Sequence, residues 1–214
     1  MILLGQYDSP FVRRIAVLLH HHGIAFEREV LSVFADFEAV LSRHPLGKVP
    51  ALRLDDGTWL FESRAIQEWI EASQPPQRQL TPTEPELLKA TLRIEAVAIG
   101  LAEKGYERGI EVSRRDPDRR DTAMMARAER QIASALRWLE SEIALPWAAG
   151  PEFGRADLAL GVGLTYLNAK LPQLYDASSL PRLENLRSKA EAIPAFEAAP
   201  FSEAEARATG WRPK

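Results

Sequence analysis

The stretch "HPLGKVPALRLDDGTWLFES", residues 44–63, decides the fold because it predicts a β-hairpin that leads directly into a helix. Two short apolar runs, "ALRL" and "TWLF", flank "DDG", and Asp-Gly is a strong signal for a tight turn between antiparallel strands. The residues that follow place Ile66, Trp69 and Ile70 at helical spacing. The stretch therefore predicts a strand–strand–helix unit.

The residues before this stretch predict a second, parallel unit. Residues 2–5 form a short apolar run typical of a buried strand. Residues 11–23 have helical apolar spacing that ends at Gly23, and residues 26–33 alternate as a second strand. Two strands joined by a helix favour a parallel βαβ unit. One mixed sheet is therefore predicted, in the order strand, helix, strand, short helix, strand, strand, helix.

The remainder of the chain is predicted to be helical. Residues 74–85 contain four prolines and are polar, which is typical of a linker. Helices are predicted over 86–105, over 121–143, from 155 to before Pro172, and from 181 to before Pro194. We therefore predict two domains, 1–73 and 86–214, joined by the linker 74–85.

Composition narrows the function classes. The 214 residues are 46% hydrophobic and 27% charged, as in an ordinary globular protein, and the formal net charge of -3 argues against a nucleic-acid partner. No stretch approaches the ~20 apolar residues of a membrane helix, and no signal peptide is apparent, so a cytoplasmic location is expected. The absence of cysteine excludes disulfides, thiolate metal sites and an enzyme thiol nucleophile. The histidines at 20–22 lack the spacing of a helical metal site, so no metal is predicted.

Ser9 precedes Pro10 at the predicted start of the first helix. Serine is a good N-cap and proline is favoured at the first helical position, so capping alone explains the pair. A helix N-terminus also has unpaired N–H groups and a partial positive charge. A hydroxyl at that place is suited to stabilise a thiolate, which would lower the pKa of the thiol. Ser9 is therefore a candidate both for a cap and for chemistry.

Two further segments of the sequence are suited to contact a peptide ligand. Ser63 is predicted to cap the next helix, whose N-terminus would bind a carboxylate while Glu62 receives an ammonium group. Val49 precedes Pro50 at the start of a strand, and a cis bond there would leave the Val49 main chain free to pair with an extended peptide. Lys48 is placed to meet a carboxylate.

These segments occur in an order that resembles the cytosolic glutathione transferase family. The resemblance rests on "SPFVRRIAVLL", "HPLGKVPAL" and "DDGTWLFESRAIQEWIE", and on "FGRADLALG" in the helical half. It implies an α/β thioredoxin-like N-terminal domain and an all-α C-terminal helical domain. It also implies a glutathione site on the first domain, an electrophile site between the two domains, and a homodimer.

The resemblance assigns a role to each candidate residue. The glutathione-binding set that it implies is Ser9, Phe11, Lys48, Val49, Pro50, Glu62 and Ser63. Ser9 would stabilise the glutathione thiolate, and Tyr7 is the alternative hydroxyl. Val49 would pair with the cysteinyl part beside a cis-Pro50. Glu62 and Ser63 would hold the γ-glutamyl end, and Lys48 the glycine end. Phe11, Phe34 and Tyr106 are candidates for the wall of the electrophile pocket.

Three departures from the family pattern qualify these roles. No thiol is present at or near Ser9, which excludes thiol–disulfide exchange through an enzyme cysteine. His44 stands where the family commonly has asparagine. Gly154 replaces the serine or threonine of the helical capping box, but glycine is an acceptable N-cap and Asp157 can still reach back.

The sequence thus predicts a glutathione transferase. Glutathione would be the co-substrate, no prosthetic group is expected, and the thiolate would attack an electrophilic, mostly apolar small molecule in a detoxification role. The alternatives are a glutathione-dependent isomerase or dehalogenase, and a non-catalytic binding or regulatory protein with the same fold.

Overall fold

The computed structural model describes residues 1–208, which form two compact units. The first unit comprises residues 1–79 and 192–208, and the second comprises Leu80–Glu191. Residues 192–208 were predicted to belong to the second domain, 86–214, whereas in the structure they belong to the first unit. These residues pack with the first unit because the buried Arg13 guanidinium donates to the carbonyl of Ala199 at 2.7 Å. The last residues of that predicted domain, 209–214, lie outside the described part of the chain.

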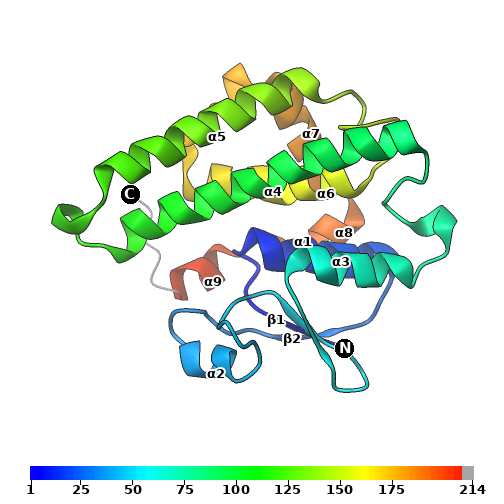
Figure 1. The fold of residues 1–214 in the computed structure, drawn as a ribbon, viewed down its shortest axis with the longest axis horizontal. Coiled ribbons are helices and arrows are strands. Elements are labelled where there is room, and N and C mark those ends of the chain that lie inside the picture. The colour runs from blue at the N-terminus through cyan, green and yellow to red at the C-terminus, as the bar shows by residue number, and fades with distance from the viewer. Residues whose placement is uncertain (209–214) are drawn as a thin grey trace. The chain divides into compact units, whose positions relative to one another are not determined.

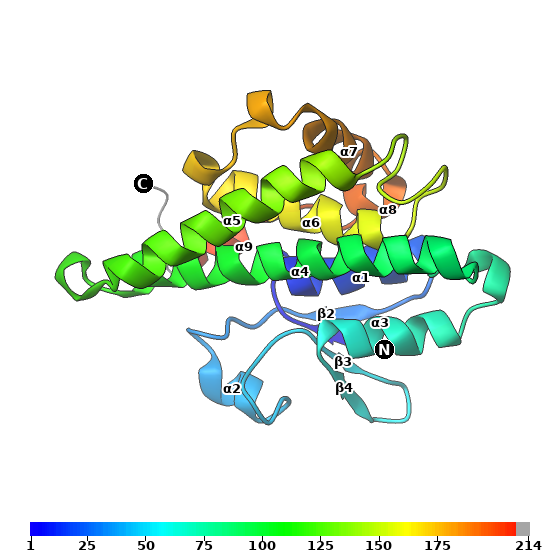
Figure 2. The same ribbon diagram turned by 45° about the horizontal axis from the view of Figure 1, so that its top comes forward.

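The first unit is a small mixed sheet, as predicted, and helices lie on both of its faces (Figure 1). Its elements are β1 (Ile2–Leu4), α1 (Pro10–His22), β2 (Glu27–Glu29), α2 (Phe37–Leu41), β3 (Ala51–Arg53), β4 (Trp59–Phe61), α3 (Ser63–Ala72), α8 (Pro194–Glu197) and α9 (Glu203–Ala208). The strand order is β2-β1-β3-β4, with β1 and β2 parallel and the other pairs antiparallel. Helices α1 and α3 cover one face and α2 lies on the other (Figures 1 and 2).

Local rules account for the boundaries of α1. Ser9 is the N-cap, Pro10 is the first helical residue, and Gly23 closes the helix in the left-handed conformation with φ 68°. Most of the helix is buried against the sheet and α3. The second strand was predicted over 26–33 but spans only Glu27–Glu29, because its residues face solvent and the chain then turns toward α2.

The second unit is helical, as predicted. Its elements are α4 (Pro85–Arg114), α5 (Thr122–Glu142), α6 (Arg155–Lys170) and α7 (Pro181–Glu191), with short 3-10 helices at Pro117–Arg119, Pro172–Leu174 and Ala177–Ser179. Helices α4 and α5 form a long antiparallel hairpin, and α6 packs on α4 (Figure 1). Across residues 1–208, no helix combines the length and apolar character that crossing a membrane requires.

Helix α4 is longer than the sequence predicts. The prediction ended this helix at Gly105, because glycine weakens helices and commonly follows them. In the structure the helix continues to Arg114. A Cβ at position 105 would lie 2.8 Å from a side-chain carbon of Leu167 and 3.2 Å from a ring carbon of Tyr166, so a larger residue would require these α6 side chains to shift. Gly105 is therefore a packing residue.

The start of α6 is fixed by the buried carboxylate of Asp157. As predicted, Gly154 is the N-cap, and Asp157 accepts its N–H at 2.9 Å. The other carboxylate oxygen accepts the N–H of Ala148 at 2.7 Å, which ties the preceding loop to the helix. Burial raises the pKa of Asp157 to about 6, although both N–H groups favour the charged form.

We expect this raised pKa to appear in the pH dependence of stability. Because the folded pKa exceeds the unfolded value, the folded state binds more protons between about pH 4 and pH 6, so unfolding becomes easier as the pH rises through that window. The variant Asp157→Asn does not titrate. The difference in unfolding free energy, wild type minus variant, should therefore fall by roughly 3 kcal/mol from pH 3.5 to pH 7. Urea titrations of both proteins measure it, and a difference that rises with pH contradicts the assignment.

Candidate functional site

The strand register brings three predicted segments to one end of the sheet. Leu4, Ala51 and Phe61 lie side by side on β1, β3 and β4. Beyond them the chain continues into the loop 5–9, backwards into the segment 48–50, and forwards into Glu62. Helices α1 and α3 both begin at this end. The site thus has two helix N-termini and one short extended segment, which together favour an anionic, peptide-like ligand.

Ser9 lies at the first of these helix N-termini. Its Oγ accepts the N–H of Val12 at 3.4 Å, and the residue is half-buried. A hydroxyl has one donor and two acceptor sites, so a hydroxyl that accepts in the cap keeps its proton for another partner. The predicted cap is confirmed, and this geometry leaves the Ser9 hydroxyl proton available to an anion.

Tyr7 is held in a network that sequence analysis missed. Its N–H donates to Glu205 of α9 at 2.7 Å, and the Arg28 guanidinium lies 3.4 Å from the centre of its ring. Arg28 also donates to both carboxylate oxygens of Glu205, at 3.0 and 2.9 Å, and Gln6 donates to the Glu205 carbonyl at 3.1 Å. Burial, more than any nearby charge, raises the pKa of Tyr7. Tyr7 is therefore a neutral phenol within a packed cluster.

Val49 and Pro50 form the second side of the site. The bond between them is cis, as the resemblance implies. Within residues 1–208 the N–H and C=O groups of Val49 form no hydrogen bond, although the residue is only half exposed. Such a main chain is suited to pair with an extended peptide, as an added strand would. The neighbouring Lys48 is exposed.

His44 replaces asparagine without loss of the local turn. Its Nδ1 accepts the N–H of Leu46 at 3.0 Å, the contact that a short amide side chain makes two residues ahead. The ring packs on Phe61 with centroids 4.5 Å apart. Burial, together with the charge of Lys48, lowers the pKa of His44, so the ring is neutral at pH 7. The departure from the family pattern therefore preserves the loop that leads to Val49.

The cap of α3 corrects one prediction. Glu62, and not Ser63, is the N-cap, and Ser63 is the first helical residue. Glu62 Oε2 accepts the N–H groups of Arg64 at 3.0 Å and Ala65 at 3.3 Å, because its longer side chain reaches back over the first turn. Glu62 has a φ of 69°, in the region that favours glycine. Strained residues of this kind gather at functional sites.

This cap leaves two groups for a ligand. Among the described residues, Glu62 Oε1 accepts only the Ser63 hydroxyl, at 3.3 Å, so it has room for an ammonium group. Ser63 contributes its hydroxyl and a main-chain N–H that has no acceptor among residues 1–208. Because Ser63 is 2% exposed, a ligand carboxylate would have to displace Glu62 Oε1 from it.

The remaining candidates are less closely tied to this sheet end. Phe11 is half-buried in the first turn of α1, Phe34 is exposed between β2 and α2, and Tyr106 is exposed on α4. Their role in an electrophile pocket stays a prediction. Of the consecutive histidines, His22 contacts the buried Glu71 at 2.9 Å. In the part of the chain that the structure describes, no three histidine or acidic side chains are grouped to hold a metal ion.

Comparisons with known proteins agree with this architecture. A family model for the N-terminal domain of glutathione S-transferases matches residues 8–73. The uncharacterized GST-like protein YibF of Escherichia coli is 32% identical over 169 residues, which cover 78% of this chain and 82% of that protein. The crystal structure of a Methylobacterium radiotolerans glutathione S-transferase with glutathione sulfonate is 27% identical, with a TM-score of 0.87 over 95% of this chain and 96% of that one. A glutathione-bound glutathione S-transferase from Methylobacillus flagellatus is 26% identical, with a TM-score of 0.86 over 94% and 99%.

Proposed function

The chain belongs to the glutathione S-transferase family, and from this membership we propose that it binds reduced glutathione at the sheet end and activates the thiol for transfer. One observation supports this most strongly. The register brings the α1 and α3 N-termini together with the unpaired main chain of Val49. Two related structures contain glutathione or its sulfonate, which agrees with a ligand of this size and charge.

The three parts of glutathione match three groups of this site. The cysteinyl part would pair with the N–H and C=O of Val49, as an added strand does. The γ-glutamyl carboxylate would accept from the Ser63 N–H and hydroxyl, and its ammonium would contact Glu62 Oε1. The glycine carboxylate would meet the exposed Lys48. These proposed contacts would bring the sulfur near the start of α1.

Ser9 would then stabilise the thiolate. Its hydroxyl donates to the sulfur while its oxygen still accepts from Val12, and the positive end of α1 adds to the effect. Tyr7 is the weaker candidate because its raised pKa makes the phenol a poorer donor, and its ring lies under Arg28. No general base is required, since water can take the thiol proton.

The second substrate would be an electrophilic, mostly apolar small molecule. The thiolate sulfur forms a bond to the electrophilic carbon, and the leaving group departs with the electron pair of the broken bond. In an addition reaction, the carbanion that forms takes a proton from water. We propose that this chemistry serves detoxification, and that the protein is a cytoplasmic homodimer.

Calorimetry with reduced glutathione tests the proposal. We expect binding at one site per chain with a millimolar or lower dissociation constant, followed by turnover of an activated aryl chloride. Absence of heat at millimolar glutathione would exclude the proposal. Binding without conjugation of aryl chlorides, epoxides or enones would instead favour the non-catalytic alternative. Glutathione-dependent isomerisation or dehalogenation would favour the other enzymes that use the same thiolate.

A further inference from the structure

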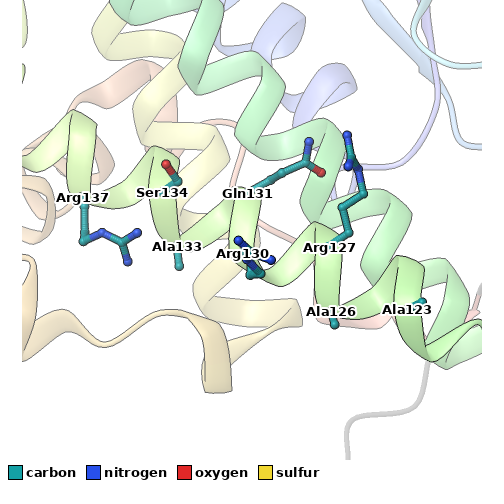
Figure 3. A pocket seen from close by; sticks show the side chains of 8 residues that line it. All are labelled: Ala123, Ala126, Arg127, Arg130, Gln131, Ala133, Ser134 and Arg137. Atoms are coloured by element: carbon teal, nitrogen blue, oxygen red, sulfur yellow. The ribbon is translucent and has the colours of Figure 1, made fainter.

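A groove of about 630 Å³ runs along the exposed face of α5 in the second unit (Figure 3). Its lining side chains all come from α5. They include Arg127, Arg130 and Arg137 and three small residues: Ala133 and Ser134 lie between Arg130 and Arg137 along the helix, and Ala126 directly precedes Arg127. We call these six residues the α5 arginine face.

The three guanidiniums of this face lack partners. Among residues 1–208, Arg127, Arg130 and Arg137 form no hydrogen bond or ion pair, and all three are exposed. Most other exposed cations of the same unit have partners, among them Lys89 with Glu86, Arg93 with Glu142, and Arg115 with Glu111. In the described part of this unit, Arg119 is the only other exposed cation without such a partner, and it lies outside α5, so three unpartnered cations gather on this face in a chain whose formal net charge is -3.

Helical geometry gathers the three charges on one side of α5. At 3.6 residues per turn, Arg127, Arg130 and Arg137 lie within about 80° of one another around the axis, and Arg130 and Arg137 are about 10 Å apart along it. Along the helix, Ala133 and Ser134 lie between Arg137 at one end and Arg130, Gln131 and Arg127 toward the other (Figure 3). Like charges at this spacing repel one another. Ala133 and Ser134 have short side chains, which leave room for an anion to relieve that repulsion (Figure 3).

We propose that the α5 arginine face binds a small, extended polyanion with at least two phosphate or carboxylate groups. The planar guanidinium donates two parallel hydrogen bonds to such oxyanions, and these charge-assisted bonds are the strong ones. The ten-ångström span requires a ligand with separated charges, because a single oxyanion would contact one or two arginines only. Ser134 and Gln131 add neutral donors along the same face.

Titration calorimetry with tripolyphosphate and with citrate, at constant ionic strength, tests this site. We expect at least one of the two to bind one-to-one with a millimolar or lower dissociation constant. Comparison of the two anions shows whether phosphate or carboxylate is preferred. The triple variant Arg127→Gln, Arg130→Gln, Arg137→Gln should weaken binding by roughly tenfold or more for each bidentate contact that is lost.

The variant Lys89→Gln, Arg93→Gln, Arg115→Gln is the matched control, because it removes the same amount of positive charge from cations that are paired. It should bind the anion within twofold of wild type, and both variants should bind glutathione normally. Failure of both anions to bind wild type, or equal weakening by the two variants, overturns the proposal. Sedimentation of all three proteins tests the alternative that a second subunit, and not an anion, binds this face. If only the arginine-face variant loses self-association and no anion binds, the face is a contact between subunits.

Discussion

Replacing Ser9 by alanine should lower kcat/KM for glutathione conjugation by about 10²–10³-fold, the usual cost of removing one donor from a developing or stabilised anion. The cause is the loss of the only hydroxyl at the α1 N-terminus that both caps the helix and keeps a free proton. The pKa of enzyme-bound glutathione should rise toward that of a free thiol, about 8.5. Ultraviolet titration of the thiolate measures this directly.

Three variants separate capping from chemistry. Ser9→Ala loses the cap and should cost about 1 kcal/mol of stability, whereas Ser9→Gly retains an acceptable N-cap at a cost of a few tenths. Both should lose activity equally, because both lack the hydroxyl. Ser9→Thr keeps cap and hydroxyl and should retain most activity. If Ser9→Gly titrates as wild type does and Tyr7→Phe does not, Tyr7 is the thiolate ligand and our assignment is wrong.

The parts of the fold that obey local rules could be predicted. Ser9 and Gly23 were identified as helix boundaries because caps depend on a few neighbouring residues. The hairpin and the mixed sheet followed from the Asp-Gly turn and the apolar runs. The segment before Pro50 was also identified from the residues, but its cis bond followed only from the resemblance to a family, because the residues do not fix the isomer.

The rest depends on contacts that no local pattern contains. Glu205 lies 177 residues from Arg28, and nothing in its polar segment marks it as a partner of the loop before Ser9. Gly105 was interpreted as a helix end because the approach of Leu167 is not visible in the sequence. At α3, serine is the usual cap, but a backbone with φ 69° lets the neighbouring glutamate take that place. At Gly105 and at the start of α3, packing and backbone conformation therefore decided the structure against the local helix and capping propensities.

Replacing Glu62 by glutamine should weaken glutathione binding by about 10–100-fold, the value of one charge-assisted hydrogen bond in a partly buried site. The amide oxygen can still accept the N–H groups of Arg64 and Ala65, so the cap and the stability should be nearly unchanged. The lost contact is the one between Oε1 and the γ-glutamyl ammonium. Calorimetry gives the affinity and thermal unfolding gives the stability of the same samples.

A glutathione analogue without the amino group identifies that contact. If Glu62 contacts the ammonium, wild type and Glu62→Gln should bind the analogue with equal affinity. The double-mutant cycle then assigns the difference in glutathione affinity to this one pair.

The variant Glu62→Gly provides a second criterion. Glycine adopts φ 69° without strain, which offsets the two cap bonds that it removes, yet it should bind glutathione no better than the glutamine variant. If the analogue discriminates between wild type and Glu62→Gln as strongly as glutathione does, the ammonium lies elsewhere and Glu62 acts only on the helix. Suppose instead that wild type and Glu62→Gln bind the analogue with equal affinity while Glu62→Gly binds glutathione weakly. That result would mean that the strained backbone at Glu62 is kept because it directs the carboxylate toward the ligand.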